Sequence, residues 1–294
     1  MLYNAVISGF GITDQTTNSI IFLITIIISM VAGYLIGSIN PAIILSKKLY
    51  GDDVRNHGSG NAGMTNMLRT FGKKMAAIIF VIDFSKAAIA ILLGTLIANL
   101  TWGGAVAALF AVVGHMFPIY YKFKGGKGVS CMLACVLILS PFSFLILVPV
   151  FLAIMLIFKY VSLASIALAM LFPLAAYAFR DTWGKPGFIP FVAFFIGALV
   201  VFMHRENLKR LLEGKENKTN FFKKKEKEGE GDASADKPEE KPSKRVKKEK
   251  PEKIYSDKDF VKCSCGRVIP ISRERCVYCK AVNTAYSPND KNKK

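Results

Sequence analysis

Long, uninterrupted apolar runs are the feature of this sequence that most constrains its fold. A helix needs about 20 apolar residues to cross a bilayer core of about 30 Å. Several runs of this kind occupy the first 203 of the 294 residues. We therefore predict an all-α polytopic membrane protein with about seven transmembrane helices, at residues 19–46, 75–98, 104–121, 129–141, 143–158, 161–179 and 188–203. The fourth run is short and meets the fifth at Pro141, so five or six spans also fit the sequence.

Positive charge alternates between the connections that join these runs. The cationic connections are residues 47–74, residues 122–127, Lys159 and the segment after residue 203. Residues 1–18 and 99–103 contain no Lys or Arg, and only the turn at 180–187 departs from the alternation. Cytoplasmic connections of membrane proteins are enriched in Lys and Arg. The pattern predicts an N-terminus outside the cell and a cytoplasmic C-terminal tail.

The first loop, defined here as residues 58–66, consists of glycines and short side chains. It reads Gly58-Ser59-Gly60-Asn61-Ala62-Gly63-Met64-Thr65-Asn66. Arg55 precedes it, and Arg69, Lys73 and Lys74 follow it. A loop of this kind can turn several backbone N–H groups toward one anion while the cations supply net charge. The alternative is a flexible polar connection between two spans.

The second loop, defined here as residues 122–128, is also rich in glycine and cations. It reads Lys122-Phe123-Lys124-Gly125-Gly126-Lys127-Gly128 and directly precedes an apolar run. The N-terminus of the following helix offers unpaired N–H groups, and Lys127 supplies a point charge. The loop is not a Walker A motif, because no Ser or Thr follows the lysine. We expect a phosphate site, with headgroup anchoring of the lysines as the alternative.

Further polar residues lie where the chain leaves the last run and within the runs themselves. His204 and Asn207 are three apart and would share one helix face; a residue at the membrane interface is the plainer interpretation of this histidine. Asp83 and Lys86, also three apart, can form an ion pair inside the membrane. Ser165 is either a helix-packing or a site-lining residue.

Three of these segments, taken in order, resemble the PlsY family of acyl-phosphate-dependent glycerol-3-phosphate acyltransferases. The resemblance covers about residues 30–215. Its motifs are Gly58-Ser59-Gly60-Asn61 with Thr65-Asn66-Met67-Leu68-Arg69, then Gly114-His115-Met116-Phe117-Pro118 leading into Lys124-Gly125-Gly126-Lys127-Gly128-Val129, and then His204-Arg205-Glu206-Asn207. It implies a bacterial plasma-membrane enzyme that transfers a fatty acyl group from acyl phosphate to the 1-hydroxyl of glycerol 3-phosphate, with lysophosphatidate and phosphate as products.

The resemblance also implies the residues of the site. The predicted catalytic residues are His204, Asn207 and Ser59. The predicted phosphate-binding residues are Arg69, Lys127, Gly58, Gly60, Asn61, Gly125, Gly126, Gly128 and Ser165. His204 and Asn207 would orient glycerol 3-phosphate, and either His204 or a substrate phosphate oxygen would take the proton.

The chemistry implied by the resemblance needs no cofactor. An acyl phosphate is a mixed anhydride with a good leaving group, so positioning and charge stabilisation can suffice. The His-x4-Asp pair of the acyl-CoA-dependent glycerolipid acyltransferases is missing, since Ala62, Tyr120 and Lys209 stand five residues after the three histidines. We expect membrane lipids, acyl phosphate and glycerol 3-phosphate as partners, and no nucleic acid. The alternative function is transport of a phosphorylated solute.

The tail differs in composition from the rest of the chain. We expect a membrane-embedded acyltransferase domain at 1–215, a charged disordered linker at 216–258, a zinc-ribbon-like module at 259–285 and a disordered basic end at 286–294. Two close cysteine pairs predict a structural Zn²⁺ site, with reduced unliganded thiols as the alternative. The proposed ligands are Cys263, Cys265, Cys276 and Cys279.

Overall fold

The computed structural model describes residues 2–181, 188–218, 260–262 and 268–270. The chain divides into two compact units, residues 1–224 and 225–294. Within the described residues, the first unit is helical and the second contains one pair of strands. The predicted linker, apart from residues 216–218, and the predicted basic end lie outside the described residues.

The helices of the first unit follow one another with short connections. They are α1 (Leu2–Gly9), α2 (Gln15–Ser38), α3 (Pro41–Tyr50), α4 (Met64–Phe71), α5 (Lys73–Ile97), α6 (Ala105–Met116), α7 (Val129–Leu139), α8 (Pro141–Phe158), α9 (Val161–Ala178), α10 (Phe188–Met203) and α11 (Arg205–Leu212). Three short helical turns accompany them: η1 (Val54–Asn56), η2 (Leu100–Gly104) and η3 (Ile119–Tyr121).

The predicted count of seven spans is corrected by the lengths of the helices. Among the described residues, five segments are long and apolar enough to cross a membrane, and a sixth is reached if α10 and α11, which meet at 57°, count as one span. The predicted span at 129–141 forms only the 11-residue helix α7. Eleven residues rise about 17 Å, roughly half of a bilayer core.

The first predicted span, residues 19–46, is not one continuous helix. It breaks between α2, which ends at Ser38, and α3, which begins at Pro41. Proline lacks an N–H group and clashes with the preceding turn, so a helix cannot run through Pro41 unperturbed. The side chain of Asn40 accepts a hydrogen bond from the Ile43 N–H (3.1 Å) and caps α3.

Small residues allow the helices of the first unit to pack closely. A Cβ atom added to Gly33 of α2 would lie 2.6 Å from the carbonyl oxygen of Ala107 in α6, and Gly37 lies even more closely against Ala111. Membrane helices associate through such small residues because their backbones can then approach. Large apolar side chains point outward instead, as Leu145, which is 67% exposed, does on α8. This distribution suits a protein surrounded by lipid.

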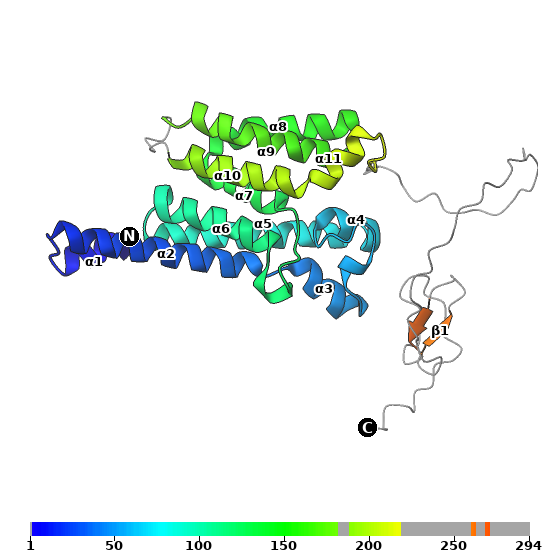
Figure 1. The fold of residues 1–294 in the computed structure, drawn as a ribbon, viewed down its shortest axis with the longest axis horizontal. Coiled ribbons are helices and arrows are strands. Elements are labelled where there is room, and N and C mark those ends of the chain that lie inside the picture. The colour runs from blue at the N-terminus through cyan, green and yellow to red at the C-terminus, as the bar shows by residue number, and fades with distance from the viewer. Residues whose placement is uncertain (1, 182–187, 219–259, 263–267, 271–294) are drawn as a thin grey trace, which may run out of the picture. The chain divides into compact units, whose positions relative to one another are not determined.

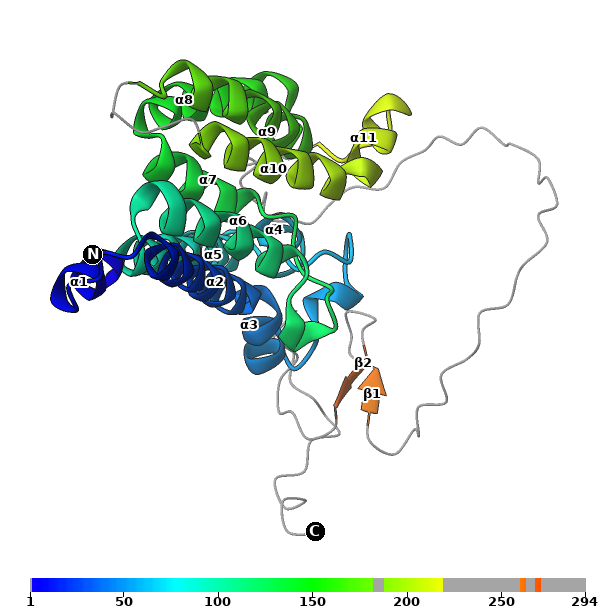
Figure 2. The same ribbon diagram turned by 60° about the vertical axis from the view of Figure 1, so that its left-hand side comes forward.

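The helices of the first unit form two groups with α7 between them. Helices α2, α5 and α6 lie together, and α8, α9 and α10 lie together on the other side of α7 (Figures 1 and 2). Helices α3, α4 and α11 gather at the end of this bundle that lies away from α1 (Figure 1). The two glycine loops and the segment after His204 therefore share one end of the bundle.

The second unit contains an antiparallel pair of strands, β1 (Phe260–Lys262) and β2 (Val268–Pro270), in which Val261 pairs with Ile269. These strands fall inside the predicted module at 259–285. The four predicted zinc ligands lie outside the described residues.

Candidate active site

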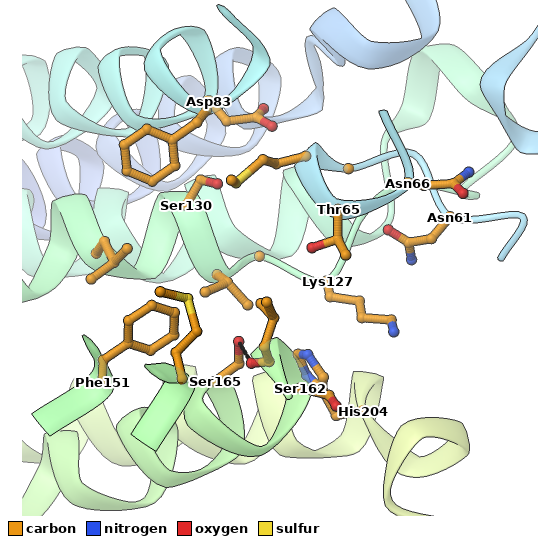
Figure 3. Close-up of a pocket in the computed structure, with 18 of the residues that line it drawn as sticks. Asn61, Thr65, Asn66, Asp83, Lys127, Ser130, Phe151, Ser162, Ser165 and His204 are labelled. Carbon is orange, nitrogen blue, oxygen red and sulfur yellow. Dashed lines mark hydrogen bonds between the residues drawn. The ribbon is translucent and has the colours of Figure 1, made fainter. Parts of the chain in front are cut away.

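A cavity of about 530 Å³ opens among the two glycine loops and α4, α5, α7, α8, α9 and α11. Its polar end is lined by residues of the predicted motifs, and its other end by apolar side chains. Figure 3 shows Lys127 between Thr65 and Asn61 on one side and His204 on the other, with Phe151 toward the opposite end. The cavity is thus amphipathic, with its cations at one end.

The first loop is shaped by the side chain of Asn66 at the start of α4. The buried Asn66 amide donates to the carbonyl oxygens of Val54 (3.0 Å) and His57 (2.9 Å), and its Oδ1 accepts from the Ser59 N–H (3.0 Å). Gly58 has a positive φ of 55°, and an added Cβ would collide with Asn66 Oδ1. Glycine is required there both for the conformation and for the space.

Arg55, which the sequence placed among the cations flanking the first loop, has a structural contact instead. Its guanidinium forms an ion pair with Asp53 (2.7 Å). The same group donates to the carbonyl oxygens of Tyr121 and Lys124, both at 3.1 Å. Arg55 therefore ties the first loop to the second.

The second loop is held by backbone hydrogen bonds to the end of α6. The Gly125 N–H donates to the Met116 carbonyl and the Gly126 N–H to the His115 carbonyl, both at 3.1 Å. These two amides, like that of Gly60, which donates to His57, are therefore occupied within the protein. In this structure these N–H groups are therefore not directed at the cavity, and phosphate binding by these glycines stays a prediction. The first turn of α7, where Val129 and Ser130 line the cavity, offers N–H groups in their place.

Lys127 lies at the polar end of the cavity and contacts the Oδ1 atom of Asn207. Burial, and next the charge of Arg210, lower the pKa of Lys127 to about 8. Arg69, on the exposed face of α4, also lines the cavity, and no ion pair of Arg69 is found among the described residues. One cation is thus enclosed and the other faces the opening.

His204 stands at the bend between α10 and α11 and is only 3% exposed. Its Nδ1 lies 2.8 Å from the Val200 carbonyl oxygen. A carbonyl can only accept, so Nδ1 carries the proton, and in the neutral ring Nε2 is an acceptor. Ser165, on α9, lines the cavity and donates its hydroxyl to the Val161 carbonyl (2.8 Å).

Glu216 is a site residue that the sequence did not reveal. Its Oε1 accepts from Asn207 Nδ2 (2.7 Å) and Ser162 Oγ (2.9 Å), and its Oε2 lies 2.7 Å from Arg210 Nε. Burial alone would raise the pKa of Glu216, but the hydrogen bonds from Asn207, Arg210 and Ser162 outweigh it and lower the pKa. The membrane domain therefore extends past residue 215, the boundary expected from composition.

The structure brings most of the predicted substrate-site residues together. Those that line the cavity are Ser59, Asn61, Arg69, Lys127, Gly128, Ser165, His204 and Asn207. Gly58, Gly60, Gly125 and Gly126 shape the loops without lining it. Thr65, Ser130, Ser162 and Glu216 are lining residues that the prediction of the site did not include. Hydroxyl groups are common in helices and loops, so only spatial proximity distinguishes the three hydroxyl residues.

Asp83 of α5 lines the cavity as well, but the other end of the cavity is otherwise a groove of apolar side chains. Its lining residues include Phe80, Phe84, Leu133, Phe144, Val148, Phe151, Leu152 and Met155. They belong to α5, α7 and α8, three helices of the apolar bundle. A ligand with an anionic head and a long apolar chain would match both ends.

The region that forms this cavity is similar in sequence to known proteins. Residues 27–214 match a family model described as glycerol-3-phosphate acyltransferase. The glycerol-3-phosphate acyltransferase of Thermoanaerobacter pseudethanolicus is 40% identical over 192 residues, which are 65% of this chain and 94% of that relative. The enzyme of the same name from Aquifex aeolicus is 40% identical over 194 residues, 64% of this chain and 96% of that relative.

Solved structures give the same result. A crystal structure of PlsY (YgiH), an integral membrane glycerol 3-phosphate acyltransferase, in its glycerol 3-phosphate form has 39% sequence identity and a TM-score of 0.60, covering 66% of this chain and 96% of that chain. Its lysophosphatidic acid form has 37% identity and a TM-score of 0.58. The predicted resemblance is confirmed: this multi-pass membrane chain belongs to the glycerol-3-phosphate acyltransferase family.

Proposed function

We propose that the protein transfers a fatty acyl group from acyl phosphate to the 1-hydroxyl of glycerol 3-phosphate. The hydroxyl oxygen attacks the acyl carbonyl carbon, the bond from that carbon to the phosphate oxygen breaks, and lysophosphatidate and inorganic phosphate leave. The observation that carries this proposal is a single cavity with a cationic end and an apolar groove. Both substrates are phosphorylated, and one of them carries a fatty chain.

Lys127 and Arg69 each bind the phosphate group of one of the two substrates. Lys127 is enclosed and held by Asn207, so it suits the phosphate nearest the reacting carbonyl. Arg69 lies on the exposed side and suits the phosphate that arrives from solution. The Ser59 hydroxyl and the N–H groups at the start of α7 add neutral donors. Positive charge placed where the leaving phosphate gains charge is worth about 10²-fold to 10³-fold in rate.

His204 orients glycerol 3-phosphate by accepting a hydrogen bond from its 2-hydroxyl at Nε2, while a phosphate oxygen accepts the hydrogen bond of the attacking 1-hydroxyl and then takes its proton. The Nδ1 atom of His204 bonds to a carbonyl rather than to a carboxylate, so a protonated ring would gain little stabilisation. Asn207 bonds to both Lys127 and Glu216 and therefore orients the lysine.

The donor is tested by giving the purified protein glycerol 3-phosphate with either palmitoyl phosphate or palmitoyl-CoA. We expect lysophosphatidate from the acyl phosphate at least about 10²-fold faster, because the anion loops bind its phosphate and no His-x4-Asp base pair is present. Comparable turnover of palmitoyl-CoA would contradict the proposed donor.

The orientation of the chain is a further part of the proposal. The distribution of Lys and Arg supports an outside N-terminus and a cytoplasmic tail, with the polar end of the cavity toward the cytoplasm. Single cysteines introduced at Gly11 and Gly214, in a variant without other reactive thiols, test it. A membrane-impermeant maleimide should label only position 11 in intact cells, and labelling of position 214 would refute the orientation.

The tail is proposed to hold one structural Zn²⁺. Strands β1 and β2 are joined by residues 263–267, which include Cys263 and Cys265, and Cys276 and Cys279 follow the second strand. Four thiolates complete a tetrahedral zinc shell. Metal analysis of the reduced full-length protein should give one zinc per chain, and Cys276→Ser with Cys279→Ser should remove it.

A further inference from the structure

A cluster of ionisable side chains lies inside the apolar bundle, below the glycine loops. Lys86 Nζ is 2.8 Å from Asp83 Oδ1, one helical turn away on α5, as their spacing predicted. His115 of α6 joins them, with Nδ1 at 3.2 Å from the same oxygen. All three side chains are at most 6% exposed. Charges at such depth are expensive, so they are normally paired or functional.

Lys86 holds three polar partners at once. Besides the Asp83 carboxylate, its Nζ lies 2.6 Å from the Ile39 carbonyl oxygen and 3.0 Å from His115 Nδ1. The Ile39 carbonyl belongs to the break between α2 and α3, where helical hydrogen bonding is interrupted. His115 Nδ1 therefore has two possible partners: the Asp83 carboxylate, to which a protonated Nδ1 would donate, and the nearer Lys86 ammonium, which can only donate to it. The second arrangement places the ring proton on Nε2.

The Nε2 edge of His115 lies against the second glycine loop. A Cβ atom added to Gly126 of the second loop would collide with His115 Nε2 and would lie 3.0 Å from the Ala62 carbonyl oxygen of the first loop. The main chain of His115 also accepts the Gly126 N–H (3.1 Å). Gly126, the residue that precedes Lys127, therefore fits closely between the His115 ring and the Ala62 carbonyl of the first loop.

A metal ion is a poor explanation of this cluster. Ligand atoms of Asp83, His115 and Cys131 lie within 4.8 Å of one another, which is compatible with a metal. However, the Lys86 ammonium already contacts the carboxylate and the imidazole. The cluster thus contains its own cation.

We propose that Lys86 and Asp83 fix the tautomer and orientation of His115, and that His115 positions the second loop, and with it Lys127, against the first loop. All three act as positioning residues for the transfer reaction described above, and this inference rests on that proposed function. The His115 tautomer can, however, be measured without any acyl donor.

The first test is NMR of the full-length protein labelled with ¹⁵N-histidine. The chain has three histidines, so a spectrum of His115→Gln identifies the His115 signals by difference. We expect His115 as the Nε2–H tautomer in the native protein and a changed tautomer population in the Asp83→Asn/Lys86→Met double variant. A native Nδ1–H tautomer would overturn the inference, whichever acyl donor the enzyme uses.

The second test separates positioning from stability. The double variant removes both charges and leaves no unpaired ion in the membrane. We expect it to keep a melting temperature within a few degrees of the native protein while kcat falls by about 10²-fold, the cost of a misplacement near 1 Å. Thr95→Val is the matched control, because it removes a polar group of α5 that bonds only its own helix.

The conservative pair at His115 sharpens this result. Glutamine can place an amide N–H near the position of Nε2, whereas asparagine reaches only the position of Nδ1. We expect His115→Gln to retain a kcat within about tenfold of native and His115→Asn to match the double variant. Equal rates in the two variants, or a native kcat in the double variant, would overturn the positioning role.

Discussion

The two glycine loops face the same cavity but are held in different ways. The first loop is folded around one side chain, the Asn66 amide, which bonds to Ser59 within the loop and to Val54 and His57 just before it. The second loop is held by main-chain bonds from Gly125 and Gly126 to the end of α6, with the His115 ring behind it. The two loops are similar in composition but are held by different contacts. Substitutions in them should therefore affect activity and stability differently.

The cations of the two loops should differ most in their effect. Lys127→Ala should lower kcat/KM by about 10³-fold and Arg69→Ala by about 10²-fold, because the enclosed charge is the less screened by water. Lysophosphatidate formation by equal amounts of purified, membrane-inserted protein measures both. Near-native rates in either variant would mean that its loop anchors lipid headgroups instead.

Added methyl groups at the glycines should distinguish the two supports. Gly126→Ala pushes the second loop from the His115 ring and should lower kcat by about 10²-fold with little loss of stability. Gly58→Ala displaces Asn66, leaves buried polar groups unpaired, and should lower the melting temperature as well.

Gly214→Ala is the strain control for Gly58→Ala; Gly126 has no positive φ and needs none. Gly214 also has a positive φ, 67°, but nothing lies within 4 Å of an added Cβ. Its substitution tests backbone strain alone, worth about 1 kcal/mol. If Gly58→Ala and Gly214→Ala behave alike, strain rather than contact with Asn66 explains the effect of Gly58→Ala.

The sequence predicted the helices and motifs but not what holds the motifs together. Apolar runs and glycine loops are local patterns, readable without knowledge of the fold. The break before Pro41 is also a local feature of the sequence. It was missed because the apolar run continues on both sides of the proline. Arg55 meets Tyr121, and Lys127 meets Asn207 at a separation of 80 residues. Such contacts follow from helix packing, which no local pattern specifies.

The C-terminal end of the membrane domain also depends on a contact that no local pattern specifies. Composition places the boundary of the acyltransferase domain at residue 215, which implies that a chain ending there stays active. We expect a chain that ends after Lys215 to lose about 30-fold in activity, because it lacks Glu216, which holds Asn207. This loss corresponds to about 2 kcal/mol, typical of a hydrogen bond to a charged group. A chain ending after Lys218 should be fully active, and Glu216→Gln should fall between them.

The smallest expected effect is a pH dependence confined to the second loop. The pKa of Lys127 is about 8, below the usual value for lysine because the group is buried. Lys127 is therefore charged at pH 7 and loses its charge as the pH rises through 8, while substrate phosphates, with second pKa values near 6, stay ionised. Initial kcat/KM should fall by about tenfold between pH 7 and pH 9. Lys127→Arg, whose charge persists over this range, should lose the alkaline fall relative to its own rate at pH 7. An unchanged fall in Lys127→Arg would assign the titration to another group, and a flat native profile would mean that Lys127 keeps its charge in the working enzyme.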